Sequence, residues 1–88
     1  NVNEVTIGYE LSPAVFDVTI TLYTLNGEEV IKFDLEDGDF YPGTYNEKRW
    51  DLQNSASDDV APGLYIVLIS AETGDGIFYD TQKFAVIR

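Results

Sequence analysis

Cysteine and histidine are both absent from the 88 residues of the sequence. Without cysteine there is no disulfide framework and no thiolate nucleophile, and the redox compartment is left open. Without histidine as well, a Ser-His-Asp triad and an imidazole-based metal site are excluded. A pair of carboxylates could still catalyse a reaction, but it needs a cleft to hold the substrate, and a domain this small rarely has one. We therefore expect that the protein is not an enzyme.

Basic residues are scarce, with five Lys and Arg against 16 Asp and Glu, and the net charge is −11. Such a surface repels phosphate backbones and anionic membranes, so we expect no nucleic-acid partner. The sequence has neither a signal peptide nor an apolar run of about 18 residues, so we expect no membrane insertion. The acidity fits cation binding, a salty medium or solubility alone, and the composition does not choose among these.

Hydrophobic residues make up 44% of the chain and charged residues 24%, which is typical of a folded globular protein. A chain of 88 residues is long enough for one core and too short for two. We therefore expect a single domain over residues 1–88. Because the sequence begins at Asn1 without a methionine, we interpret it as a module excised from a larger protein.

Alternation of apolar and polar residues predicts short β-strands along most of the chain. The expected strands cover residues 5–11, 16–23, 28–35, 44–50, 64–72 and 77–87. Turn signals separate them at regular spacing, and no amphipathic helix of useful length interrupts them. This pattern indicates an all-β fold, an immunoglobulin- or fibronectin-III-like β-sandwich of about six or seven antiparallel strands.

Three of these segments carry more specific expectations. Asn26-Gly27 predicts a type I′ hairpin turn, because this pair best tolerates positive φ at both central positions. The strand at 44–50 has no uniformly apolar face, so we expect it at a sheet edge or bulged. The strand at 64–72 is almost continuously apolar, so we expect it to be central and covered on both faces.

The rest of the chain is organised around a corner that runs from Trp50 to Tyr65. It joins the only tryptophan to the most apolar run through a polar loop and a Pro-Gly turn. Trp50 is expected in the core, because an indole ring can remove roughly 150–250 Å² from water. Tyr65 follows Pro62-Gly63, and we expect its hydroxyl to bond nearby backbone as a tyrosine corner does. The residues expected to hold the fold are Trp50, Gly63, Tyr65, Asn26 and Gly27.

Two kinds of ligand site stay open. Calcium prefers several carboxylate and carbonyl oxygens that converge from a flexible loop. Candidate calcium ligands are Asp51, Asn54, Ser55, Asp58 and Asp59 in the corner, and Glu36, Asp37 and Asp39 in an earlier loop. Neither group has the spacing of an EF-hand, and in the alternative interpretation these short side chains bond nearby backbone amides. Glycans often stack on exposed aromatic rings, and the candidates, whose alternative role is cross-strand packing, are Tyr23, Tyr41, Tyr45 and Tyr79.

Several short motifs occur in an order that is typical of a known class of domains. In chain order they lie at residues 5–11, 17–23, 25–30, 42–44, 50–51, 60–65 and 83–88. Together they resemble the immunoglobulin-like domains of the flagellar hook-capping protein type and the C-terminal sorting domains of type IX secretion. Two features depart from that pattern. Leu52 stands where the family usually has glycine after Trp-Asp, and residues 1–4 do not match the Tyr-Pro-Asn-Pro type of opening.

The resemblance implies a non-catalytic accessory module of a secreted or cell-surface bacterial protein. Such a module acts as a spacer, stabilises its parent or serves as a sorting and surface-attachment domain. The implied partners are neighbouring domains of the parent, secretion machinery or a cell-surface glycan, and the implied location is extracellular or at the cell surface. The alternative function is a ligand-binding module for polysaccharide or Ca²⁺, and no other cofactor is expected. Fold-level analogy alone does not fix function.

Overall fold

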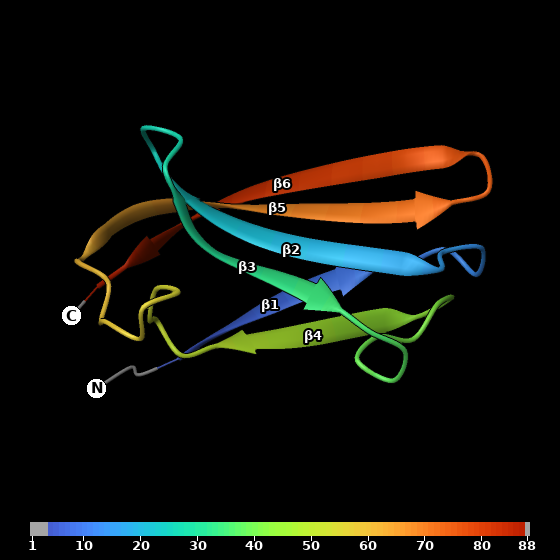
Figure 1. The fold of residues 1–88 in the computed structure, drawn as a ribbon, viewed down its shortest axis with the longest axis horizontal. Helices are drawn as coiled ribbons and strands as arrows, with labels where there is room; N and C mark the ends of the chain where they lie inside the picture. The colour runs from blue at the N-terminus through green and yellow to red at the C-terminus, as the bar shows by residue number, and fades with distance from the viewer. Residues whose placement is uncertain (1–3, 88) are drawn as a thin grey trace.

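The computed structural model describes residues 4–87. The strands are β1 (Val5–Glu10), β2 (Asp17–Thr24), β3 (Glu29–Leu35), β4 (Tyr45–Trp50), β5 (Gly63–Thr73) and β6 (Gly76–Val86). They form two antiparallel sheets, one of two strands in the order β1–β4 and one of four in the order β3–β2–β5–β6 (Figure 1). The fold is all-β and sandwich-like, and the strand positions predicted from alternation are confirmed to within a few residues.

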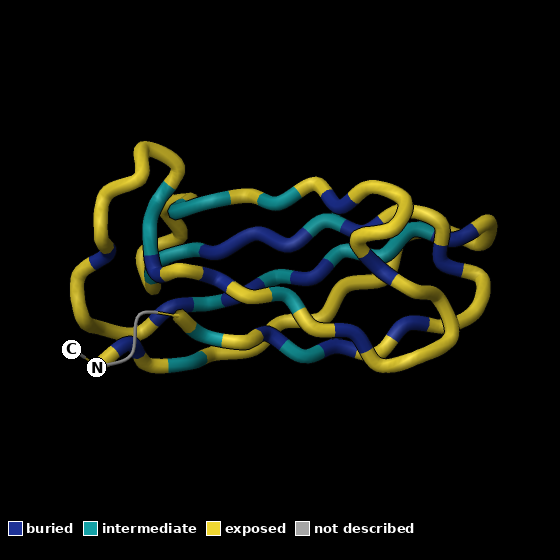
Figure 2. Tube along the Cα trace, turned by 90° about the horizontal axis from the view of Figure 1, so that it is seen from below, coloured by how far each residue is buried: buried dark blue, intermediate teal, exposed yellow. Residues whose placement is uncertain are grey.

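The core lies between the two sheets, and its centre is formed by the paired strands β2 and β5. Ile20 lies opposite Ile69, and Leu22 lies opposite Val67. All four side chains are buried, because alternate residues of a strand point to the same face. Figure 2 shows the resulting dark blue stretches inside the molecule, with exposed turns at both ends. Burial of apolar side chains such as these is the main driving force for folding.

The outer face of β5 is only half-buried, so the prediction that this strand is covered on both faces is wrong. Tyr65, Val67 and Ile69 are buried, whereas Ile66 and Leu68 between them are partly exposed. A continuous apolar run predicts two covered faces only where a second layer lies on each face. Among residues 4–87 there is no such layer over the outer face of the four-stranded sheet.

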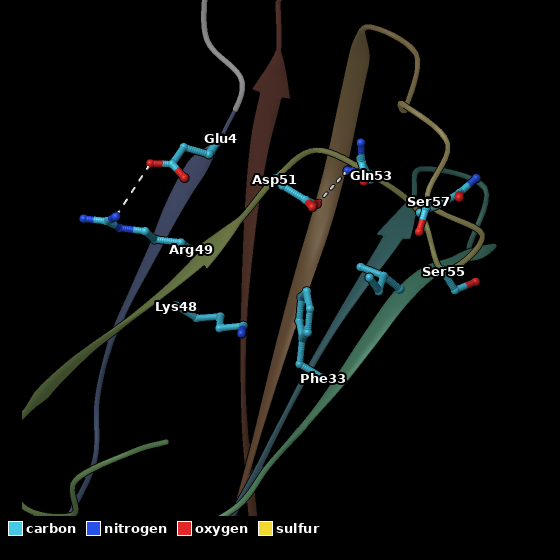
Figure 3. A pocket seen from close by; sticks show the side chains of 10 residues that line it. Glu4, Phe33, Lys48, Arg49, Asp51, Gln53, Ser55 and Ser57 are labelled. Carbon is cyan, nitrogen blue, oxygen red and sulfur yellow. Dashed lines mark hydrogen bonds and ion pairs between the residues drawn. The ribbon is translucent and has the colours of Figure 1, made fainter. Parts of the chain in front are cut away.

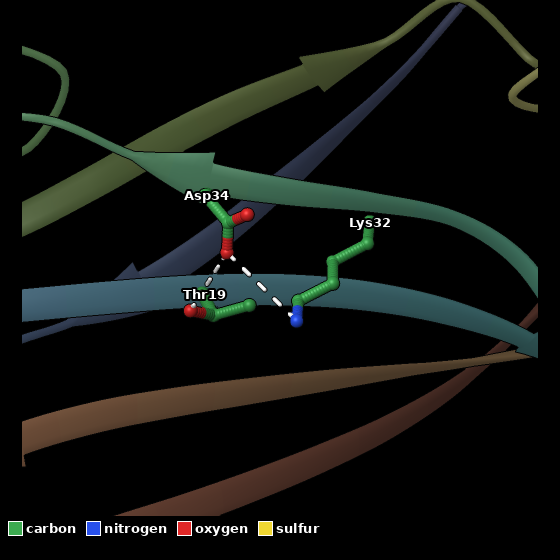
Figure 4. Close-up of polar contacts among 3 residues, drawn as sticks. All are labelled: Thr19, Lys32 and Asp34. Atoms are coloured by element: carbon green, nitrogen blue, oxygen red, sulfur yellow. Dashed lines mark hydrogen bonds and ion pairs between the residues drawn. The ribbon is translucent and has the colours of Figure 1, made fainter.

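Polar contacts occupy the β2–β3 part of this outer face. The hydroxyl of Thr19 donates to Asp34 Oδ1 at 3.4 Å, and Lys32 Nζ lies 4.0 Å from the same oxygen (Figure 4). Both carboxylate contacts are exposed to solvent, so they contribute little to the free energy of unfolding. They are typical of a sheet face that meets water rather than another layer.

The β2–β3 hairpin forms where it was predicted, but the prediction of a type I′ turn is wrong. The amide of Gly27 donates to the Thr24 carbonyl at 3.0 Å, and the amide of Thr24 donates to the Glu28 carbonyl at 2.9 Å. Gly27 has a φ of 87°, whereas Asn26 has no positive φ. The loop therefore contains three residues, 25–27, and its glycine alone takes the left-handed conformation. The pairing register also shifts next to this hairpin, because Leu22 pairs with Ile31 and Tyr23 pairs with Glu29, which leaves Val30 as an extra residue of β3.

Strand β4 lies at a sheet edge, as its mixed faces predicted. It pairs with β1 in a continuous register that runs from Val5 opposite Trp50 to Glu10 opposite Tyr45, with no bulge. The Tyr45 ring lies across Gly8 of β1, where the hydroxyl occupies the space that a Cβ would need. Glycine at this position therefore lets the ring cover the backbone of β1 on its outer face.

The chain enters β1 and leaves β6 at the same end of the sandwich (Figure 1). Val5 pairs with Trp50, Val86 pairs with Gly63, and the corner of residues 51–62 connects Trp50 to Gly63. The opposite end carries the β1–β2 loop, the β3–β4 loop and the β5–β6 turn. The corner and the two points where the chain enters and leaves the sandwich therefore lie at one end, away from these three connections.

Candidate functional site

The corner between β4 and β5 is held from inside by Trp50. Its side chain is 1% exposed, and its indole nitrogen donates to the Gln53 carbonyl at 2.8 Å. Leu52, between them, has a φ of 63° and is 2% exposed. The amide of Val60 donates to the Leu52 carbonyl at 2.9 Å, which closes the corner. The only polar atom of the indole is thus hydrogen-bonded to the corner, and the apolar side chain of Leu52 is buried in the same corner.

Three aromatic rings pack where the corner meets β5 and β6. The ring centroid of Trp50 lies 6.0 Å from that of Tyr65 and 6.0 Å from that of Phe84, at interplanar angles of 71° and 83°. These edge-on arrangements suit the quadrupoles of aromatic rings. The hydroxyl of Tyr65 donates to the Ala61 carbonyl at 2.5 Å, four residues upstream. Tyr65 therefore fastens the end of the corner to the start of β5.

Three of the candidate calcium ligands of the corner, Asp51, Asn54 and Asp59, accept hydrogen bonds from other groups of the corner. Asp51 Oδ1 accepts from the Gln53 amide at 3.2 Å, and Asn54 Oδ1 accepts from the amides of Ala56 and Asp58 at 2.9 and 3.0 Å. Asp59 Oδ1 accepts from the side-chain amide of Gln53 at 3.4 Å. These bonds match the alternative interpretation, in which short polar side chains hold a turn.

Among the remaining calcium candidates, Ser55 contributes its backbone to the fold and Asp39 contributes its carboxylate. The backbone amide of Ser55 donates to the Val30 carbonyl of β3 at 3.1 Å, which ties the corner to the four-stranded sheet. In the earlier loop, Asp39 Oδ2 accepts from the Glu36 amide at 3.1 Å. Within residues 4–87 there is no group of three or more His, Cys, Asp or Glu side chains that could hold a metal ion. The candidate acids are thus spread along loops rather than converging on one point.

An open pocket of about 360 Å³ lies between the corner, β3 and β4 (Figure 3). Its lining residues are Glu4, Ile31, Phe33, Lys48, Arg49, Asp51, Gln53, Asn54, Ser55 and Ser57. The Lys48 ammonium lies 4.5 Å from the centroid of the Phe33 ring, a cation–π distance. The Arg49 guanidinium lies 4.0 Å from Glu4 Oε1. The pocket thus combines an aromatic face with two cations, two carboxylates, amides and hydroxyls, groups that can bind a hydroxylated ligand.

Neither Lys48 nor Phe33 was identified from the sequence. They lie in different sheets, and only the closure of the sandwich brings them together. The one signal available in the sequence was the scarcity of basic residues, because Lys48 and Arg49 are two of only five in the chain. They are also the only two basic residues that are adjacent in the sequence.

The candidate glycan-binding tyrosines do not form one platform. Tyr45 points from the outer face of the two-stranded sheet, where it crosses Gly8. Tyr79 pairs with Ser70 and points from the outer face of the other sheet. Tyr23 shares that second face but is partly buried, and Tyr41 is 64% exposed in the β3–β4 loop. Tyr45 and Tyr79 therefore cannot stack on the same sugar chain.

Tyr9 is an unusual member of the core. Its side chain is buried at the inner face of β1, and its hydroxyl is the one buried side-chain polar atom among residues 4–87 that has no hydrogen-bond partner. Burial raises the pKa of the Tyr9 phenol above 10.0, and the nearby Asp39 carboxylate raises it further. The group therefore stays neutral in the folded protein at neutral pH.

No protein-family model matches the chain, and no curated protein and no solved structure matches it significantly. Over residues 4–87, no helix has the length and apolar character needed to cross a membrane.

Proposed function

We propose that the chain is a non-catalytic accessory module of a secreted or cell-surface bacterial protein, with an immunoglobulin- or fibronectin-III-like fold. In this role it spaces or stabilises neighbouring domains, or sorts and attaches its parent at the cell surface. The observation that carries the proposal is how the corner uses its polar groups. Tyr65, Asn54 and Asp51 each satisfy a nearby backbone group, so these side chains serve the fold rather than a substrate.

The strand order supports the finer fold assignment. In an immunoglobulin-like sandwich, strands A, B, E and D lie in one sheet and strands C′, C, F and G lie in the other. Among residues 4–87 no strand corresponds to A or D. Here β1 and β4 occupy the places of B and E, and β3, β2, β5 and β6 those of C′, C, F and G. On this assignment Tyr65 lies near the start of F and bonds the backbone upstream, which is the position of a tyrosine corner.

A test of the module proposal compares the protein alone with the same chain inserted between two stable reporter domains. An independent module keeps its own cooperative unfolding transition, with nearly the same melting temperature in both settings. A chain that is unfolded alone, or that loses its separate transition in the fusion, contradicts the proposal. For the sorting role, the chain is fused behind a fluorescent protein that carries its own N-terminal export signal, in a bacterium that has type IX secretion. Reporter that stays inside the cell rules that role out.

A second candidate function, binding of a polysaccharide, is favoured by the pocket between β3 and β4. Phe33 offers an apolar face, and Lys48 offers a cation that would suit a carboxylated sugar. The test is retention on insoluble acidic and neutral polysaccharides, with Lys48→Ala as the variant and Lys83→Ala, on another strand, as the matched control. Unretarded migration of the parent protein through all the polymers removes this candidate.

A further inference from the structure

The sandwich is asymmetric, because a sheet of two strands faces a sheet of four. Strand β4 lies against β3, as the contact between Lys48 and Phe33 shows. Strand β1 lies toward β6, where the side-chain amide of Gln82 donates to the Gly8 carbonyl at 3.4 Å. The side of β1 that faces away from β4 therefore opens beneath β6, and among residues 4–87 no third strand pairs with it.

The backbone of β1 presents an edge on that side with which no strand pairs among residues 4–87, and its Gly8 carbonyl is held by the Gln82 side chain alone. Leu11, just after β1, exchanges hydrogen bonds with the β4 side, since its amide donates to Thr44 and its carbonyl accepts from Gly43. In an antiparallel pair the bonded residues alternate along the strand. Thr6, Gly8 and Glu10 consequently direct their amides and carbonyls toward the open side. An edge of this kind is a template for pairing with another strand.

The inner face of β6 is uncovered above the same edge. Phe78 pairs with Ala71 and Asp80 pairs with the buried Ile69, so both side chains point toward the interior of the sandwich. Phe78 is nevertheless 61% exposed, whereas Phe84, farther along the same face, packs against Trp50. The core thus covers one half of this face and leaves the other half bare.

An apolar pocket of about 270 Å³ lies at the bare half. Leu11 and Val15 line it from the β1 side, and Ala71 and Phe78 line it from the β5–β6 side. Glu10, Ser12 and Thr73 complete its wall. One strand laid along β1 would send every second side chain toward the inner face of β6, which carries Phe78, Asp80 and Gln82. The side chains nearest the pocket would cover Phe78. A β-strand edge and an apolar recess thus lie within reach of the same strand.

We propose that the open edge of β1 binds an extended peptide segment with alternating apolar and basic residues, which adds a third strand to the β1–β4 sheet. The apolar residues face the pocket and Phe78. The basic residues point outward, where Glu10 of β1 and Glu47 of β4 share the outer face, and Arg49 on that face is already close to Glu4. This is β-strand addition, in which main-chain bonds give affinity and alternate side chains give specificity.

Charge selects this partner over a second copy of the chain. Each copy carries a net charge of −11, so pairing two β1 edges would bring like charges together, including two Glu10 side chains. A basic strand instead neutralises the carboxylates at the edge. The binding should therefore weaken as salt is added.

The test uses a fluorescent synthetic peptide of alternating valine and lysine, about ten residues long, so that it can span β1. Binding to the folded protein is measured by fluorescence anisotropy. Phe78→Ser should weaken binding about tenfold, because it removes the apolar contact. Tyr79→Ser is the matched control, since Tyr79 is the next residue of β6 and faces the other way. Thr6→Pro should also weaken binding, because it removes an amide from the β1 edge.

Two peptide controls separate strand pairing from charge attraction. The valine–lysine peptide is made in two N-methylated forms, one methylated at the valines and one at the lysines. Only one form should lose binding, because a strand pairs with an edge through every second amide. A peptide of alternating serine and lysine should bind much more weakly, because it has the charge without the apolar face. Equal binding by this peptide, equal loss with both methylated peptides, or no binding of the valine–lysine peptide overturns the proposal. Circular dichroism confirms that each protein variant is folded.

Discussion

The indole nitrogen of Trp50 donates to the Gln53 carbonyl at 2.8 Å, and the backbone between them passes through Leu52 in the left-handed region. A leucine there is strained, because its Cβ crowds the backbone at positive φ. Its side chain is nevertheless 2% exposed, so burial of the side chain compensates for the strain. Leucine at this place thus accepts a strained backbone and supplies an additional core residue.

Leu52→Ala should lower the free energy of unfolding by about 2–5 kcal/mol, because it empties a buried position and keeps the strain. Leu52→Gly should be more stable than Leu52→Ala by about 1 kcal/mol, since glycine adopts positive φ freely. Chemical denaturation of both variants measures the difference. Val60 is the control, because it is buried without a positive φ and glycine there should be worse than alanine. If glycine were more stable than alanine at both sites, or less stable at both, the strain at Leu52 would not explain the difference.

Tyr65→Phe should lower the free energy of unfolding by about 1–2 kcal/mol, because it leaves the Ala61 carbonyl without its hydroxyl donor. The same substitution at Tyr9 is a matched comparison, because that buried hydroxyl has no partner to lose. Tyr9→Phe should be neutral, or stabilising by up to about 1 kcal/mol. Urea unfolding of the two variants gives both values, and a loss at Tyr9 as large as that at Tyr65 would refute this reasoning.

Alkaline pH should destabilise the protein partly through Tyr9, whose pKa is raised above 10.0 by burial and by Asp39. Above the ordinary pKa the unfolded chain releases the phenol proton while the folded protein still holds it, so stability falls as pH rises. Below that pKa both states hold the proton and the effect vanishes. Urea unfolding measured across this range should show a shallower fall for Tyr9→Phe than for the parent. If the free energy of unfolding fell equally with pH in both proteins, Tyr9 would not contribute to the alkaline destabilisation.

Asn54→Ala should lower the free energy of unfolding by about 1–2 kcal/mol, because two backbone amides lose their acceptor. Asp58→Ala, whose neighbouring contacts use the backbone, should change it by less than about 0.5 kcal/mol.

Thermal melts with and without millimolar Ca²⁺ test the calcium interpretation with the same variants. A Ca²⁺-dependent rise in melting temperature that Asp51→Ala or Asp58→Ala abolishes would establish a metal site in the corner.

Moderate sodium chloride should raise the melting temperature, because a net charge of −11 makes the folded state repel itself at low ionic strength. Potassium chloride at the same ionic strength serves as the control and should give an equal rise, since screening does not depend on the cation. A melting temperature that stays flat or falls in both salts would show that self-repulsion is not a significant term.

The strands could be predicted from the sequence because alternation is a local property, visible in β1 and β2 without knowledge of the fold. The turn after β2 could not be fully predicted, because Asn26-Gly27 fits both a two-residue loop and a three-residue loop with Gly27 alone at positive φ. The half-open face of β5 was missed because a run of apolar residues does not reveal how many layers cover it.

The pocket between β3 and β4 was missed for a different reason. Phe33 and Lys48 meet only because two sheets close on one another, and neither residue carries a spacing signal. The bare inner face around Phe78 is hidden in the same way, since its exposure depends on the number of strands in the opposite sheet. Contacts between sheets are set by the whole topology, whereas each strand pattern is set by its own residues.

Because the chain enters β1 and leaves β6 at one end, force applied at those two points would act across the strands rather than along them. The pairs Val5–Trp50 and Gly63–Val86 lie nearest the points of load, so they would open first. The ladders behind them would then separate pair by pair, as in unzipping, instead of resisting together in shear. Under tension, the corner that anchors the core would therefore be the first region of the domain to yield.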